Sequence, residues 1–273
     1  MLRGIGAHFT TLLLSGFAAA SVQAQTADTL DTKGPFLIAG DAAIVGGFTL
    51  LTITSAPADR FFTRELQDEA RQANRSLNRG ATVFRLLGHP GGLFTGAGLY
   101  AGGLIGGNRR VEDLGLHTVE SIAIANTITL AIKVTAGRAR PRKNPDKARD
   151  FKLFRGLGDD EYRSFPSGHS SAAFAFASIV TAETHRWWPD SRWIIGPIVY
   201  GGAALTGVSR IYNNAHWASD VIAGAAIGTL TGLKVYTYTH SHPNNRVDKF
   251  FLRAGVQISN NRSMMPIVST VSR

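Results

Sequence analysis

The stretch EYRSFPSGHSSAAFAFASIV, residues 161–180, places a rigid turn and a histidine directly before a run of small and aromatic apolar residues. Pro166 favours a turn, Ser167 is a preferred N-cap residue, and Gly168 lets the backbone approach another group closely. The unpaired N–H groups and positive dipole end of such a helix start favour an anion. The stretch therefore predicts a helix that begins at an anion site with His169 at its rim, although alone it fits an ordinary capped helix start equally well.

Outward from this helix, apolar segments rich in Ala, Leu, Ile and Gly recur along the chain. Alternation typical of strands is weak, so the sequence predicts an all-α fold, a six-helix-type bundle. The stretch 59–80 is amphipathic at helical spacing, and we expect it to pack on the bundle rather than lie on a membrane surface. The helices of the bundle are expected at about 36–56, 91–107, 121–137, 170–184, 193–208 and 218–236.

The N-terminus has the order of a secretory signal peptide. Arg3 precedes an apolar run, Phe9 to Val22, and the small-residue motif Val22-Gln23-Ala24 follows. Cleavage there would leave an exported protein in the periplasm or at the outer face of the membrane, while an uncleaved anchor is the alternative. The predicted parts are a signal peptide at 1–24, a helical domain at 25–244 and a polar tail at 245–273 with a strand-like piece near 255–259.

Composition narrows the class of function. Lys plus Arg total 29 against 19 Asp plus Glu, a net charge of +10, which fits phosphates or anionic lipid headgroups. Nucleic acid is not an expected partner, because the sequence has no zinc-finger spacing or basic heptad helix. Cysteine is absent, which excludes disulfides and thiolate chemistry. Most apolar segments are shorter than the roughly 20 residues of a spanning helix, so hydropathy fits both an embedded and a soluble bundle; we favour membrane association.

Two further stretches place reactive or charged side chains at helix ends. Lys133 and Arg140 are seven residues apart, two helical turns, so both cations can project from one face. Arg210 ends the next-but-one segment, and His216 and Asp220, four residues apart, open the last helix as a possible hydrogen-bonded pair. If consecutive helices run antiparallel, these groups meet the anion site at one end of the bundle. A phosphoryl group would then find cations, a nucleophile and an acid together.

The three stretches together resemble the three-part signature of the type 2 phosphatidic acid phosphatase and vanadium haloperoxidase superfamily. Each part alone is common, whereas the three in order and at family-like separations are specific. The resemblance covers residues 133–220. Its parts are Lys133-(six residues)-Arg140-Pro141, then Pro166-Ser167-Gly168-His169, then Ser209-Arg210-(five residues)-His216-(three residues)-Asp220.

The resemblance implies a role for each of these residues. His216 would be the nucleophile that forms a phosphohistidine, Asp220 would orient its ring, and His169 would protonate the leaving alkoxide. The phosphate would be bound by Lys133, Arg140, Ser167, the backbone N–H of Gly168, and Arg210. The family's chemistry implies no metal or organic cofactor, since fixed cations can take a metal's place.

The activity implied by the resemblance is that of an exported phosphatase acting on phosphomonoesters or lipid pyrophosphates. A lipid-linked substrate is favoured by the apolar segments. Two alternatives stay open. One is a vanadium-dependent haloperoxidase, since the same cradle can hold vanadate, and the other is a non-catalytic phosphate- or lipid-binding envelope protein.

Two remaining features concern anions and metals. The loop after Arg140 is strongly basic, and we expect it to attract phosphate-bearing substrate or lipid headgroups, with a solvated face as the alternative. His240 and His242 lie in a polar stretch without a carboxylate neighbour and are expected to be solvated rather than metal-bound. The basic loop residues are Arg142, Lys143, Lys147, Arg149, Lys152 and Arg155, against Asp146 and Asp150.

Overall fold

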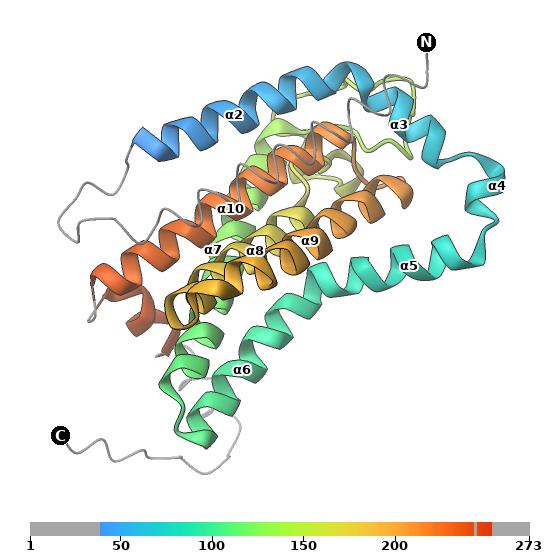
Figure 1. Cartoon of the computed structure of the whole chain (residues 1–273). Coiled ribbons are helices and arrows are strands. Elements are labelled where there is room, and N and C mark those ends of the chain that lie inside the picture. The colour runs from blue at the N-terminus through green and yellow to red at the C-terminus, as the bar shows by residue number, and fades with distance from the viewer. Residues whose placement is uncertain (1–38, 243–244, 253–273) are drawn as a thin grey trace, which may run out of the picture.

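The computed structural model describes residues 39–242 and 245–252, and it shows a bundle of helices (Figure 1). No strand occurs in those ranges, so the predicted all-α fold is confirmed. The predicted signal peptide and the strand-like piece near 255–259 lie outside the described residues. The α-helices are α2 (Ala39–Ser55), α3 (Asp59–Leu66), α4 (Glu69–Gln72), α5 (Arg75–Leu86), α6 (Gly92–Gly106), α7 (Arg109–Ala136), α8 (Gly168–Trp187), α9 (Ile195–Tyr212) and α10 (Ala218–Ser241). Residues 246–252 are also helical, which their polar composition did not predict.

The expected apolar segments correspond to α2 and to α6 through α10, and the largest difference is in α7. This helix begins at Arg109 rather than near 121, because the Asn108 side chain caps it by accepting from the Arg110 and Val111 amides. Its first half carries buried polar side chains that lower the hydropathy on which the expectation rested. At the other end Gly137 adopts φ 56°, a left-handed conformation that closes the helix just before the first signature loop.

Helix α8 lies at the centre of the bundle and packs against α7, α9 and α10 (Figure 1). Phe174 and Ile179 on α8 are fully buried. The α10 backbone approaches α8 so closely that a Cβ on Gly224 would lie 2.4 Å from the Ser167 carbonyl oxygen, and one on Gly228 would lie 2.2 Å from that of Ser171. These glycines allow the N-terminal ends of α8 and α10, which carry two signature parts, to lie side by side.

The amphipathic stretch 59–80 is divided among three helices rather than forming one. The side chains of Asp68 and Asn74 accept hydrogen bonds from amides that follow them, which starts α4 and α5 anew. Phe62 and Leu66 pack against a buried cluster of Ile211, Ala218 and Val221. Packing on the bundle is therefore confirmed for α3, whereas Leu77 on α5 is 46% exposed.

Several outer surfaces of the bundle are apolar. Among the described residues, three helical segments are long and apolar enough to cross a membrane: Gly40–Leu66, Arg109–Ala136 and Pro189–Tyr212. Phe94 and Ile105 on α6 are 73% and 84% exposed. Large exposed apolar side chains on adjacent long helices are typical of a surface that meets lipid, which supports the expected membrane association.

Candidate active site

The residues of all three signature parts lie at one end of the bundle. The α7–α8 loop and the α9–α10 loop meet there, because Arg140 Nη1 is 3.5 Å from His216 Nε2. The Lys133 side chain reaches the start of α8, since a Cβ on Gly168 would lie 3.6 Å from Lys133 Cε. The antiparallel order of the helices thus brings together groups that are more than 80 residues apart in sequence.

His216 is buried in the loop between α9 and α10. Its Nδ1 lies 2.7 Å from the carbonyl oxygen of Ser164. A carbonyl oxygen only accepts hydrogen bonds, so Nδ1 carries the hydrogen and Nε2 keeps its lone pair, directed at Arg140. Burial and the charge of Lys133 hold the pKa of His216 well below its usual range, so the ring is neutral. A neutral imidazole with an available Nε2 is the form that a nucleophile requires.

Asp220 lies beside His216 but does not make the expected hydrogen bond to it. Its Oδ2 is 3.7 Å from His216 Nδ1, beyond hydrogen-bonding distance. That oxygen instead accepts from the Ser164 hydroxyl at 2.5 Å and from the Trp217 amide at 2.9 Å. Ser164 therefore stands between the two residues: its carbonyl orients the ring and its hydroxyl holds the carboxylate.

Arg138 links Asp220 to the rest of the fold, although no sequence pattern had selected it. Its guanidinium is 2% exposed, lies 2.8 Å from Asp59 Oδ2 and also donates to Asp220 Oδ1. Ser219 joins the network by donating its hydroxyl to Asp59 at 2.6 Å. The carboxylate beside His216 is thus fixed by a buried cation from the first signature loop and by the start of α3.

The three signature cations differ in how many of their N–H groups have a hydrogen-bond acceptor. Lys133 Nζ donates to the Arg163 carbonyl at 2.7 Å, and Arg140 donates to the Asp160 carboxylate at 2.8 Å. Arg210 is only 8% exposed, yet its Nε and Nη1 have no hydrogen-bond acceptor within the part of the chain that the structure describes. Buried guanidinium N–H groups without acceptors are costly, so this side chain marks a place for an anion.

The start of α8 follows the sequence expectation. Ser167 is its N-cap and accepts a hydrogen bond from the Ser170 amide. His169 follows in the first turn, and its ring lies 5.6 Å from that of His89, centroid to centroid. Burial, with the charge of Arg210 next in size, lowers the pKa of His169 to about 3.

Two residues near His169 were missed by sequence reasoning. The charges of His89 and Arg85 act on the His169 ring together with those of the signature cations. Both come from the end of α5 and the turn that follows it, outside the three-part pattern. A lone arginine on an amphipathic helix carries no sequence signal that would assign it to a site formed 80 residues later.

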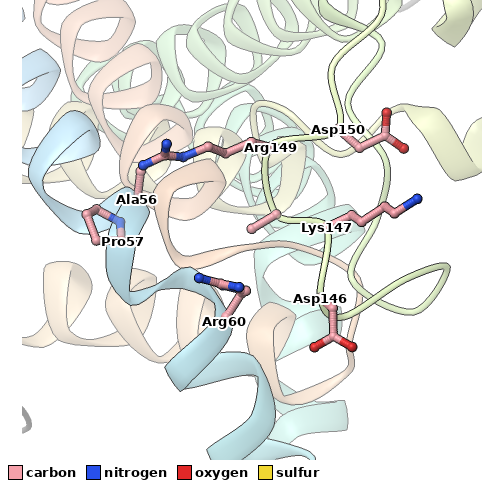
Figure 2. Close-up of a pocket in the computed structure, with 8 residues that line it drawn as sticks. Ala56, Pro57, Arg60, Asp146, Lys147, Arg149 and Asp150 are labelled. Carbon is pink, nitrogen blue, oxygen red and sulfur yellow. The ribbon is translucent and has the colours of Figure 1, made fainter.

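The basic loop contributes to a separate pocket of about 640 Å³ beside the active-site end (Figure 2). The pocket lies between the α2–α3 connection and residues 146–150, and Arg60, Lys147 and Arg149 line it. Other basic residues of the loop are neutralised: Arg142 pairs with Glu161, and Arg155 lies 2.9 Å from Asp150. Lys147 and Arg149 are therefore the basic loop residues that the pocket presents to a ligand, together with Asp146 and Asp150.

Comparison with known proteins finds a family match for the region that holds the site. Residues 114–243, which include all three signature parts, match the family described as the PAP2 superfamily. This part of the chain belongs to the PAP2 superfamily. The matched region stops just after the end of α10. It does not include Asp59, although the carboxylate of Asp59 completes the Arg138 network.

Several similar proteins have names that describe lipid phosphatases. A lipid A 1-phosphatase of Porphyromonas gingivalis is 48% identical over 71 residues, 25% of this chain and 15% of that protein. Lipid phosphate phosphatase 1 of Arabidopsis thaliana is 32% identical over 148 residues, 45% of this chain and 43% of that protein. The chain thus spans less than half the length of either relative.

A solved structure shares the fold over most of this chain. It is the transmembrane PAP2 type phosphatidylglycerolphosphate phosphatase from Bacillus subtilis, with a TM-score of 0.57 and 21% identity. The similarity covers 76% of this chain and 98% of that one. The helical arrangement of Figure 1 is therefore one that a membrane protein of this family also adopts.

Proposed function

We propose that this chain is an exported lipid phosphatase that removes a phosphate group from a membrane lipid through a phosphohistidine at His216. The observation that carries the proposal is the Arg210 guanidinium, buried with two N–H positions lacking acceptors among the described residues, close enough to Arg140 for their charges to interact. A phosphate bound there would supply those acceptors. The lipid part is supported by the exposed apolar helices and by the names of the relatives.

The first chemical step breaks the ester or pyrophosphate bond. His216 Nε2 attacks phosphorus, and the leaving oxygen departs on the opposite side, where it takes from His169 the proton that the substrate monoanion transfers to that ring on binding. The ring of His216 becomes positively charged, and its Nδ1–H stays bound to the Ser164 carbonyl with Asp220 3.7 Å away. Lys133, Arg140 and Arg210 stabilise the charge that grows on the phosphoryl oxygens.

The second step returns the enzyme to its starting state. A water molecule attacks the phosphohistidine, and neutral His169 takes up the proton that the water loses. The P–N bond breaks, the lone pair returns to His216 Nε2, and inorganic phosphate leaves with the proton that His169 had taken up. The Ser164 carbonyl keeps the ring in one orientation through both steps, which favours in-line attack each time.

A phosphate-release assay on the full chain tests the proposal. The substrates are phosphatidic acid, phosphatidylglycerol phosphate, polyprenyl pyrophosphate, lipid A carrying a 1-phosphate, and the soluble ester p-nitrophenyl phosphate, each with and without detergent. We expect kcat/KM for at least one lipid to exceed that for the soluble ester by about a hundredfold, since binding energy from the lipid is used in the transition state. Equal values would contradict the lipid assignment, and no release from any substrate would contradict phosphatase activity.

The pKa of His169 predicts an acid-favoured pH profile. Because that pKa is lowered to about 3, the ring in the empty site is neutral above about pH 4. The proton for the leaving group must then enter on the substrate, and a phosphomonoester keeps one proton only below its second pKa, about 6. We expect kcat/KM to be constant between about pH 4.5 and 6. Above about pH 6 it should fall roughly tenfold per pH unit. A profile measured with a phosphomonoester that rises through pH 7 to 8 would contradict this assignment of the proton.

The cations of the pocket predict a salt-dependent contribution to substrate capture. Replacing Lys147 and Arg149 by Gln should raise KM for an anionic lipid by roughly 3- to 10-fold at low salt, with little change in kcat. The difference should shrink at 0.5 M salt, because screening removes it. Arg142→Gln is the matched control, since Glu161 already pairs with that side chain. Equal KM values for the double variant and the control at low salt would reject the role of the pocket.

A further inference from the structure

A second group of ionisable side chains is buried at the other end of α7. The distance from the active site follows from the helix: His117 precedes Lys133 by 16 residues, about 24 Å along its axis. The group brings together α7, α8, α10 and the short helix at 246–252. Its members are His117, Glu120, Glu183, His240 and Asp248.

The inner part of this group has carboxylates without partners. One ligand-type atom from each of His117, Glu120 and Asp248 lies within 4.8 Å of the other two. Glu120 is 0% exposed, and neither of its oxygens has a hydrogen-bond partner among the described residues. Oδ1 of Asp248 also has none there. A buried carboxylate without donors is strongly unfavourable unless a cation or a proton compensates it.

The outer part of the group fixes His117. Its Nδ1 is 2.5 Å from Glu183 Oε1, and the same oxygen is 2.8 Å from His240 Nε2. An ionised carboxylate only accepts, so Nδ1 of His117 carries the hydrogen and Nε2 keeps a lone pair. The expectation that His240 is solvated is therefore wrong: it is half-buried and has a carboxylate partner from another helix.

This arrangement resembles the way proteins hold a transition metal. A metal-binding histidine almost always donates its other ring N–H to a carboxylate, which orients the ring and raises its basicity. Glu183 accepts from His117 in that way, and the carboxylates of Glu120 and Asp248 provide oxygen ligands close to the His117 ring. A spacing of at most 4.8 Å between the ligand atoms is compatible with one ion held by bonds of about 2.0 to 2.2 Å.

We propose that His117, Glu120 and Asp248 bind a divalent ion of the Zn²⁺ or Mn²⁺ class, with Glu183 orienting His117. The imidazole ligand favours these ions over Mg²⁺ and Ca²⁺, which prefer sites made entirely of oxygen. The ion offsets the charge of Glu120, which is fully buried, and pairs with the unsatisfied Oδ1 of Asp248. It also ties the start of α7 to the helix at 246–252, so its role is structural and separate from phosphate transfer.

Metal content and thermal stability of the untagged full chain test this site. The protein is stripped with a chelator in detergent, supplied separately with Zn²⁺, Mn²⁺ or Mg²⁺, desalted, and analysed for bound metal by mass spectrometry. We expect about one Zn²⁺ or Mn²⁺ per chain and a higher unfolding temperature with that ion. Glu120→Gln should lose the bound ion, while Glu69→Gln, an exposed glutamate on α4, should keep it. Glu183→Gln should weaken binding by about 10- to 100-fold.

Other outcomes overturn the proposal. Wild-type protein without retained metal would mean that Glu120 is compensated by a proton, and retention of Mg²⁺ alone would exclude the class of ion. Equal metal content in Glu120→Gln and Glu69→Gln would place the ion elsewhere. If Glu120→Gln does not fold, Asp248→Asn at the half-exposed edge of the group serves instead, with exposed Asp190→Asn as its control. Failure of phosphate release would leave the metal measurement unaffected, so the two proposals are separable.

Discussion

Replacing His216 by Asn should remove both turnover and the phosphoenzyme. The side-chain amide of Asn can still donate to the Ser164 carbonyl, which accepts from His216 Nδ1 at 2.7 Å, but it offers no nucleophile in place of Nε2. Loss of a nucleophile that acts together with an acid and an anion site lowers kcat by about 10⁴- to 10⁶-fold. The measurement is single-turnover mixing with ³²P-labelled substrate, followed by alkaline quenching that preserves phosphohistidine and by counting of protein-bound label.

The control separates chemistry from binding. The cations that hold the phosphate belong to other segments, so His216→Asn should bind inorganic phosphate within about tenfold of wild type. His242→Asn changes an exposed histidine and should leave labelling and turnover intact. Label that persists on the His216→Asn protein would show that another residue is the nucleophile. A His216→Asn protein with wild-type turnover would instead reject the catalytic role of this site.

The parts of the site that the sequence predicted are those specified by neighbouring residues. Ser167 and Gly168 select the start of α8 through capping and backbone freedom, both of which act within one helical turn. Lys133 lies in the last turn of α7 because Gly137 ends that helix. The expectation that Arg140 projects from the same helix face is wrong, since Arg140 lies in the loop beyond Gly137. Short-range rules of this kind, together with antiparallel connections, bring the three signature parts to one end of the bundle.

The parts that could not be predicted depend on contacts between distant segments. Ser164 separates His216 from Asp220, although their spacing of four residues indicated a direct pair. That spacing describes a helix, whereas His216 lies in the loop before α10 begins at Ala218. The start of α7 was missed for a related reason, since Glu120 is a buried charge whose tolerance depends on groups from other helices. A hydropathy scale scores a glutamate as polar wherever it lies, so the expected apolar segment began only after Glu120.

The largest expected effect on stability is that of Arg138→Met. Arg138 lies between the buried carboxylates of Asp59 and Asp220, each 0% exposed, and donates to both. Methionine fills a similar length of the cavity but leaves two buried charges without a counterion. Removing one partner of a buried ion pair costs about 3 to 5 kcal/mol in the free energy of unfolding. Denaturant titration of the detergent-solubilised protein measures the difference.

Two comparisons decide whether the buried network is responsible. Arg142→Met removes a half-exposed pair with Glu161 and should cost at most about 1 kcal/mol, because water already screens that interaction. Asp59→Asn added to Arg138→Met removes one of the stranded charges and should recover part of the loss, which the sum of the separate effects would not predict. If Arg138→Met is no less stable than Arg142→Met, then Asp220 does not depend on Arg138. The hydroxyl of Ser164 and the amide of Trp217 would then be sufficient to hold the carboxylate beside His216.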